Sequence, residues 1–143
     1  MAEARTATVV GGGVAGLASA VSLSQAGWQV TVLERAPEFG EVGAGLAITG
    51  NGASTALEDG VCVGRLIGAP VRDGADLGSA LSAFDQARRP RCQKIARLAV
   101  ITARFGCDLG GGWRQSVRNA MLRLAPPKIL VRAGTQVVDW TPP

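Results

Sequence analysis

Glycines that directly follow the first apolar segment constrain the fold of this chain more than any other feature. The segment Thr6–Val10, TATVV, is rich in β-branched residues and predicts a short strand. Gly11, Gly13 and Gly16 come next with the spacing G-x-G-x-x-G, at the start of a helix expected over residues 14–26. The first glycine permits a tight turn, the second leaves room for a diphosphate, and the third lets the helix pack closely on the strand.

A second strand completes this pattern. Gly27 ends the predicted helix, and Val30 and Val32 alternate with polar residues in the segment 28–33, WQVTVL. Glu34 closes the segment, where a carboxylate can accept hydrogen bonds from ribose hydroxyls and repels a 2′-phosphate. Amide groups and the helix dipole favour the diphosphate without any lysine. The residues therefore predict a Rossmann-like βαβ unit that binds FAD or NAD in preference to NADP.

An export signal is the alternative interpretation of the same stretch. Arg5 precedes the apolar run, and the segment 17–20, LASA, resembles a small-residue cleavage site. Four glycines interrupt the run at residues 7–23, and each weakens a helix by roughly 1 kcal/mol relative to alanine. The run is also shorter than the ~20 residues that a membrane span needs. Both arguments favour the nucleotide-binding interpretation.

The composition is that of a globular chain and excludes several chemistries. Hydrophobic residues make up 47% of the sequence and charged residues 18%, and there is no histidine. Imidazole-based metal sites and histidine triads are therefore excluded. The three cysteines are odd in number and form no CxxC pair, which favours reduced thiols in the cytoplasm and makes zinc an unexpected ligand. We expect no metal site.

Charge is divided unevenly along the chain. Residues 1–60 carry two arginines against six acidic residues, a net charge of −4, whereas residues 61–143 carry thirteen basic residues against five acidic ones, a net charge of +8. A basic second half could contact nucleic acid or an anionic surface. A solvated helix face is favoured instead, because the arginines are dispersed and aromatic stacking partners are few. We therefore expect no nucleic-acid partner and no membrane partner.

The first third of the chain resembles a known flavoprotein family. The run from Val9 to Glu34, followed by Arg35, Pro37 and GEVGAGLAITGNG (residues 40–52), is similar to the N-terminal part of the FAD-dependent monooxygenases related to para-hydroxybenzoate hydroxylase. In that family an arginine often follows the ribose-binding acid, and a GAG stretch leads toward the flavin. The resemblance implies FAD as the cofactor, with contacts from Gly11, Gly13, Val14, Ala15, Gly16, Glu34, Arg35 and Gly45.

The rest of the chain resembles the C-terminal part of proteins of the same family. The segments 52–68, GASTALEDGVCVGRLIG, and 79–91, SALSAFDQARRPR, are similar to its final helices. In family members the first of these helices points its N-terminus at the pyrimidine edge of the flavin, where its dipole favours negative charge. The resemblance thereby adds Gly52 and Ala53 to the cofactor-binding residues.

The two resemblances meet near Asn51, which implies an internal deletion. The intervening substrate domain of the family is missing from the sequence, so we expect an α/β fold with a Rossmann-like βαβ FAD-binding unit of the GR2 flavoprotein type, followed by C-terminal helices. Residues 1–52 would form the FAD-binding segment, and residues 53–143 a mainly helical segment that packs on it in one compact domain.

The resemblance also implies an activity. Family members are oxidoreductases that hydroxylate aromatic or similar small molecules, using NAD(P)H and O2 with FAD, so a small aromatic substrate is the expected partner. No residue is assigned a catalytic role, because the segments that would enclose the substrate are absent. The alternative is a catalytically incompetent remnant or a nucleotide-binding module.

Further elements follow from local patterns. We expect helices over residues 55–67 and 113–124, and a loop over 68–78, which is rich in glycine, proline and aspartate. A long helix after it should be kinked or divided in two at Pro90, and residues 129–132 and 136–140 could form a hairpin. Two parallel strands leave sheet edges exposed, which predicts marginal stability or homo-oligomerisation.

Overall fold

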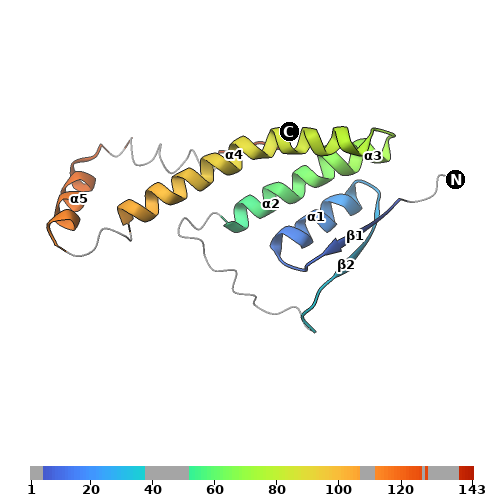
Figure 1. The fold of residues 1–143 in the computed structure, drawn as a ribbon, viewed down its shortest axis with the longest axis horizontal. Coiled ribbons are helices and arrows are strands. Elements are labelled where there is room, and N and C mark those ends of the chain that lie inside the picture. The colour runs from blue at the N-terminus through green and yellow to red at the C-terminus, as the bar shows by residue number, and fades with distance from the viewer. Residues whose placement is uncertain (1–4, 38–51, 107–111, 127, 129–138) are drawn as a thin grey trace. The chain divides into compact units, whose positions relative to one another are not determined.

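The computed structural model describes residues 5–37, 52–106, 112–126, 128 and 139–143 of the chain. The chain divides into two compact units, one formed by Met1–Cys92 with Pro142–Pro143 and the other by Gln93–Thr141. Figure 1 shows the strands and the helices α1, α2 and α3 in the first unit and α5 in the second, while the long helix α4 crosses the boundary between them.

The βαβ unit predicted from the sequence is present. Strand β1 (Thr6–Val10), helix α1 (Val14–Gln25) and strand β2 (Gln29–Leu33) follow one another, and the strands pair in parallel with Thr6 opposite Gln29 and Val10 opposite Leu33. In both strands half-buried residues alternate with exposed ones, as expected for a sheet that is covered on one face only. The predicted α/β class and Rossmann-like unit agree with this arrangement.

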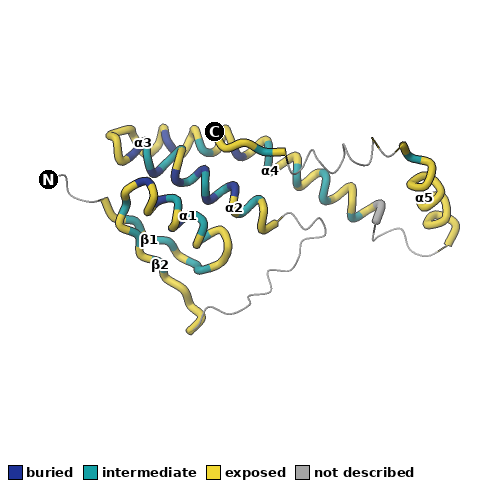
Figure 2. The backbone as a smooth tube through the Cα atoms, turned by 180° about the vertical axis from the view of Figure 1, so that it is seen from behind, coloured by how far each residue is buried: buried dark blue, intermediate teal, exposed yellow. Residues whose placement is uncertain are grey.

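A long helical run follows and lies along α1. It consists of α2 (Gly52–Cys62), the π-helical segment η1 (Val63–Gly68) and α3 (Ala69–Arg72), which continue one another without a break. Figure 2 shows that the buried residues of the first unit gather where this run, α1 and the adjoining part of α4 lie together. The core of this unit is therefore formed mainly between helices.

Glycines spaced four residues apart make the approach of the two helices close. A Cβ atom added at Gly60 would collide with Ala18, and one added at Gly64 would lie 2.6 Å from the Cβ atom of Ser22. One added at Gly68 would lie 2.9 Å from a methyl carbon of Leu23. At Gly60 and Gly64 the added atom would also meet backbone atoms of α1, so these two positions require glycine.

Residues 69–72 correct the loop predicted for 68–78, because they are helical. Composition suggested a loop, but tertiary contacts hold the helix: Val71 is buried, and the Arg72 guanidinium donates a hydrogen bond to the Ala26 carbonyl over 2.9 Å. The loop is limited to residues 73–76, where Gly74 has a positive φ of 101°. Asp76 then accepts a 2.9 Å hydrogen bond from the Ser79 amide and so caps the next helix.

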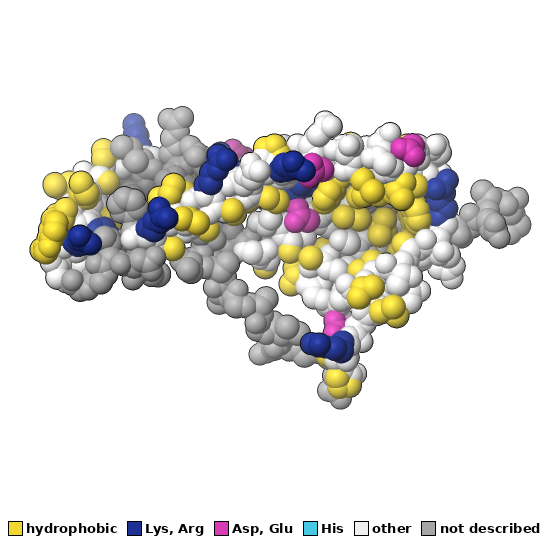
Figure 3. All heavy atoms as spheres, viewed as in Figure 1, with side chains coloured by type: hydrophobic (Ala, Val, Ile, Leu, Met, Phe, Trp, Pro, Cys, Tyr) yellow, Lys and Arg dark blue, Asp and Glu magenta, His cyan; other side chains and the backbone are white. Residues whose placement is uncertain are grey.

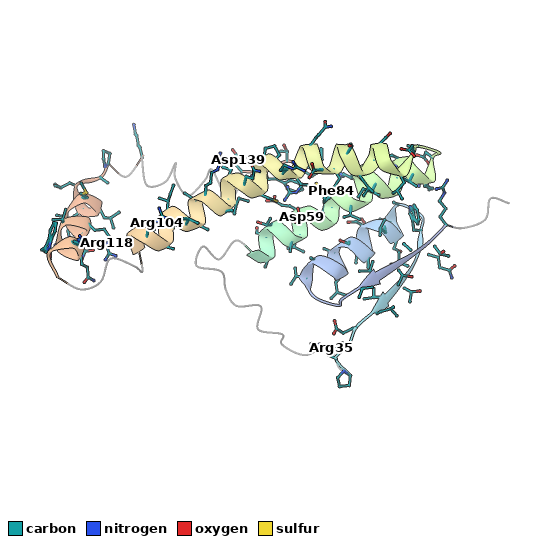
Figure 4. The ribbon with its side chains drawn as sticks, viewed as in Figure 1. Arg35, Asp59, Phe84, Arg104, Arg118 and Asp139 are labelled. Atoms are coloured by element: carbon teal, nitrogen blue, oxygen red, sulfur yellow. The ribbon has the colours of Figure 1, made fainter. Side chains whose placement is uncertain are left out.

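Helix α4 (Leu77–Gly106) runs through Pro90 without being divided, so of the kink or division predicted there the division is wrong. Two arginines on either side of the proline fix this stretch to α2. Arg88 donates to Asp59 over 2.5 Å, and Arg91 donates to both oxygens of Glu58 over 2.5 and 2.6 Å. Figure 4 shows Asp59 between α2 and α4. These ion pairs stabilise the helix on both sides of a residue that donates no backbone hydrogen bond.

The ion pairs lie largely out of solvent. The Arg88 side chain is 4% exposed and the Glu58 side chain 11%. The hydrogen bond from Arg91 is the main reason that the pKa of Glu58 lies below its ordinary value of 4.5. The Glu58 carboxylate therefore contributes to stability wherever it is ionised.

The second unit contains the last part of α4 and helix α5 (Trp113–Leu124), whose bounds match the prediction. Gly112 precedes α5 with a positive φ of 107°. The predicted hairpin at 129–132 and 136–140 lies almost entirely outside the described residues. None of the helices in the described ranges has the length and apolar content that crossing a bilayer requires.

Gly64→Val tests the close helix contact. The new side chain must displace Ser22, so we expect the free energy of unfolding to fall by about 1–3 kcal/mol, the usual cost of overpacking. Urea denaturation measures this change. Ala87→Val is the matched control, since it places the same β-branched residue on an exposed part of α4. Equal effects of the two substitutions would show that helix propensity, and not the contact, is responsible.

Glu58→Gln tests the ion pairs. At neutral pH we expect the free energy of unfolding to fall by roughly 3 kcal/mol, because the substitution removes one partner of buried charges. The wild-type contribution is present above pH 4.5 and is lost as the pH falls through the lowered pKa of Glu58, so the variant should show a weaker acid dependence. Asp85→Asn breaks the exposed pair with Arg89 and should cost at most about 0.5 kcal/mol. A larger loss there than at Glu58 would contradict the assignment.

Candidate nucleotide-binding site

The glycine turn between β1 and α1 is shaped by two close backbone contacts. Gly11 has a φ of 105°, a conformation that residues with side chains rarely adopt, and its amide donates to the Leu33 carbonyl over 2.8 Å. A Cβ atom at Gly16 would collide with the Gly11 carbonyl oxygen. The first and third glycines thus hold the turn against β2 and against the first turn of α1.

Gly13 has a different role, because it faces open space. It is the N-cap residue of α1 with extended backbone angles of −73° and 178°, and a Cβ atom added to it would have no atom within 4 Å. A glycine has no side chain with which to cap the helix, so the first amides of α1, those of Val14, Ala15 and Gly16, have no side-chain cap. These amides and the positive end of the helix dipole are suited to binding an anion.

Glu34 joins this turn to the end of β2. Its Oε2 accepts a hydrogen bond from the Gly12 amide over 2.5 Å, and its Oε1 accepts one from the Ala36 amide over 2.8 Å. The bonds from Ala36 and then Gly12 hold the pKa of Glu34 below its ordinary value of 4.5. The carboxylate is therefore negatively charged at neutral pH and is fixed beside the anion-binding amides.

The N-terminus of α2 lies at the same end of the helical layer. Gly60 contacts Ala18 and Gly64 contacts Ser22, so α1 and α2 run in parallel, with contacting residues 42 positions apart in the sequence. This register places Gly52 and Ala53, both exposed, level with the beginning of the glycine turn. Figure 1 shows the two helices beginning at the same end.

The remaining predicted site residues are less well defined. Arg35 is exposed in the bend after β2, where Figure 4 labels it. Gly45 lies outside the described residues. The structure therefore brings together the glycine turn, the first turn of α1, Glu34 and the beginning of α2, while the binding roles of all these residues stay predictions.

Sequence reasoning missed the contribution of Gly12. This residue occupies a variable position of the G-x-G-x-x-G spacing, yet its amide holds the Glu34 carboxylate in place. No local sequence signal distinguishes it, because the contact joins residues 22 positions apart. The glycine stripe of α2 and η1 was also missed, although its spacing of four residues is visible in the sequence.

The fold and the turn together form a Rossmann-like βαβ unit, and comparison with known proteins gives its family. Residues 6–105 match the family described as FAD dependent oxidoreductase. The chain belongs to this family. The predicted resemblance to FAD-dependent hydroxylases of aromatic compounds is thereby confirmed at the level of the family.

Individual relatives point the same way. The chain is 32% identical over 141 residues to 3-hydroxybenzoate 6-hydroxylase of Klebsiella oxytoca, a match that covers 97% of this chain and 34% of the relative. Over 43 residues it is 56% identical to FAD-dependent monooxygenase OpS4 of Beauveria bassiana, covering 30% of this chain and 10% of the relative. It is 54% identical over 43 residues to 3-hydroxybenzoate 6-hydroxylase of Polaromonas naphthalenivorans, covering 30% and 11%.

The chain spans about a third of the length of the first of these relatives and about a tenth of the other two. No solved structure matches it. FAD is the cofactor that the family implies, and the residues present fit its adenosine diphosphate portion, because the space at Gly13 is open, α1 has no side-chain cap and Glu34 is ionised beside it.

Gly13→Ala separates binding from folding. The added methyl group meets no protein atom but occupies the space in front of the α1 amides, so we expect at least a tenfold loss of ADP affinity, about 1.4 kcal/mol, with little change in stability. Calorimetric titration and urea denaturation measure the two quantities. Gly16→Ala should instead destabilise the fold, and the exposed substitution Gln25→Ala should alter neither property. Unchanged ADP affinity in Gly13→Ala would remove the turn from the site.

Proposed function

We propose that this chain binds FAD through the glycine turn and Glu34, and that it serves in the hydroxylation of a small aromatic compound with NAD(P)H and O2. The observation that carries the binding proposal is the 2.5 Å hydrogen bond between the Gly12 amide and Glu34 Oε2. It holds the ribose-binding acid and the diphosphate-binding turn in one arrangement before any ligand arrives, which lowers the cost of ordering them.

Each part of this arrangement has a binding role. The amides of Val14, Ala15 and Gly16 donate to diphosphate oxygens, and the dipole of α1 stabilises their negative charge. Glu34 accepts hydrogen bonds from ribose hydroxyls through the lone pairs that Gly12 and Ala36 leave available. Its fixed negative charge repels a 2′-phosphate, so ligands without that phosphate are favoured at this position.

The proposed reaction rests on the family and on what its members are called. FAD supplies electron transfer between a nicotinamide donor and oxygen when it is bound. Two of the matched relatives are 3-hydroxybenzoate 6-hydroxylases and a third is an FAD-dependent monooxygenase, which supports an aromatic carboxylic acid as substrate. The beginning of α2, level with the glycine turn, favours negative charge on the flavin side of the site.

A nucleotide-binding module without turnover is the second candidate function. The hollow between α1 and β2, of about 340 Å³, is lined by Ala20, Val21, Ser24, Gln25, Val30 and Val32. None of these six side chains is ionisable, so this hollow offers no group for proton transfer to a substrate. The absence of an ionisable side chain among these six lining residues favours nucleotide binding without catalysis for this part of the chain.

Flavin content and donor oxidation distinguish the two functions. Protein that is purified yellow, with FAD released in a near-equimolar amount on denaturation, supports FAD binding. Oxidation of NADH or NADPH that is accelerated by 3-hydroxybenzoate, with hydroxylated product detected, supports the hydroxylase. Bound FAD without donor oxidation supports the binding module, and colourless protein that takes up neither FAD nor ADP contradicts both.

Glu34→Ala tests the ribose contact. The substitution removes the acceptor of the ribose hydroxyls, so we expect ADP affinity to fall by a factor of about 10. Because the pKa of Glu34 is lowered, wild-type affinity should hold as the pH falls to 4.5 and decline only below it. Titration calorimetry across this range measures both effects. Gln29→Ala, an exposed change on β2, is the control, and an equal loss there would contradict the contact.

A further inference from the structure

Helix α5 presents large apolar side chains to solvent. Trp113 is 74% exposed, Met121 67% and Leu124 84%, and Val117 is exposed as well. Among the residues described between Gln93 and Trp140, none is buried. Figure 2 shows α5 almost entirely as exposed. Soluble monomers rarely expose large apolar side chains in one continuous patch, so this face of α5 is a candidate interaction surface.

These side chains share one face of the helix. Trp113, Val117, Ala120, Met121 and Leu124 follow one another at spacings of three and four residues, which places them on a single stripe. Leu122 lies on the opposite side of the helix. Figure 3 shows hydrophobic side chains gathered over α5 with basic side chains beside them.

The charged residues of α5 that border this stripe are all arginines. Helix α5 contains Arg114, Arg118 and Arg123 and no acidic residue. Arg114 and Arg118 follow the stripe residues Trp113 and Val117 by one position and so border it on one side, whereas Arg123 precedes Leu124 and borders it on the other. Figure 4 shows Arg118 on this helix. The partner of this face must therefore combine an apolar interior with negative charge around it.

Two α5 helices from two copies of this chain do not supply that combination, because α5 contains no acidic residue. Two α5 helices packed face to face would bring their arginines together, which is unfavourable. The carboxylates described in the first unit already accept hydrogen bonds or pair with arginines, namely Glu34, Glu58, Asp59, Asp73, Asp76 and Asp85. Binding α5 to them would break these contacts.

We propose that α5 binds the surface of an anionic phospholipid bilayer, lying in the plane of the interface. The apolar stripe would enter the boundary between headgroups and acyl chains, and Arg114 and Arg123 would contact lipid phosphates, together with Arg118, which exchanges its hydrogen bonds to Asn119 for them. Trp113 at the beginning of the helix suits the same boundary, because its ring is apolar and its indole N–H needs a hydrogen-bond acceptor.

Nucleic acid is the less suitable polyanion. Its phosphates would satisfy the arginines, but the stripe between them would then face charged backbone or water. The stripe holds valine, methionine and leucine in place of the polar and stacking groups that contact bases. A bilayer surface supplies both an apolar phase for the stripe and phosphates for the arginines.

The helix is suited to lying on a bilayer and not to crossing it. It has 12 residues, about 18 Å of helix at 1.5 Å per residue, against a hydrocarbon core of roughly 30 Å. The proposal departs from the expectation of no membrane partner, which took the arginines as a dispersed and solvated face. The structure instead shows three of them bordering a single apolar stripe.

Vesicle flotation with the full chain tests the proposal. We expect the protein to float with vesicles of phosphatidylcholine and phosphatidylglycerol, and to remain at the bottom of the gradient with phosphatidylcholine alone. Replacing Arg114, Arg118 and Arg123 by glutamine should weaken binding on the order of 100-fold, since each cation near an anionic surface contributes about tenfold or less. Met121→Ser with Leu124→Ser should weaken it at least tenfold.

Two matched controls use exposed residues outside the stripe. Leu122→Ser removes an apolar side chain from the opposite side of α5, and Arg89→Gln removes an exposed arginine of the first unit. Both should bind vesicles as the wild type does. Circular dichroism of each variant shows whether α5 is retained.

Several outcomes would overturn the proposal. Equal binding to neutral and anionic vesicles would remove the role of the arginines, and an equal loss in Leu122→Ser would remove the role of the stripe. Retention on DNA without flotation would assign the face to nucleic acid. A concentration-dependent dimer that Met121→Ser with Leu124→Ser abolishes, again without flotation, would assign it to a second copy.

Discussion

Contact between two backbones is the constraint on which the first unit depends. Gly60 and Gly64 let α2 and η1 approach α1 so closely that a methyl group at either position would collide with the α1 backbone. Because the two helices run in parallel in a fixed register, their N-termini come to the same end, beside the glycine turn. The geometry of the candidate site is therefore set by packing some distance from it, through small residues that never touch the ligand.

Charge is organised around this packing. Glu58 and Asp59 on α2 pair with Arg88 and Arg91 on α4, so arginines of α4 balance the negative charge of α2. Glu34 is the only acidic residue described in the βαβ unit. It lies at the glycine turn, where backbone amides hold its carboxylate. The negative charge at the site is thus placed for ribose, and the diphosphate faces uncapped amides.

The sequence predicted the βαβ unit well because its signals are local. Gly11, Gly13 and Gly16 determine the turn by their own backbone requirements, and the alternation around Val30 indicates a strand without reference to distant residues. The loop predicted over residues 68–78 was too long, because residues 69–72 are helical and Arg72 contacts Ala26, 46 positions away in the sequence. The division at Pro90 was wrong for the same reason, since Arg88 and Arg91 bind another helix. The role of Gly12 depends on a distant acid and could not be found from local patterns.

The π-helical segment η1 has a consequence for how the glycine stripe tolerates change. In an α-helix, positions four apart drift steadily around the axis, whereas a π-helix, with its wider hydrogen-bonded turn, rotates less per residue. Placing η1 between Val63 and Gly68 lets Gly64 and Gly68 stay on the face that Gly60 begins. A π-helical turn holds about one residue more than an α-helical turn, so loss of one residue from this segment would restore ordinary winding and leave the direction of α3 nearly unchanged. The wider turn of η1 thus accommodates one residue more than a regular α-helix would place between α2 and α3.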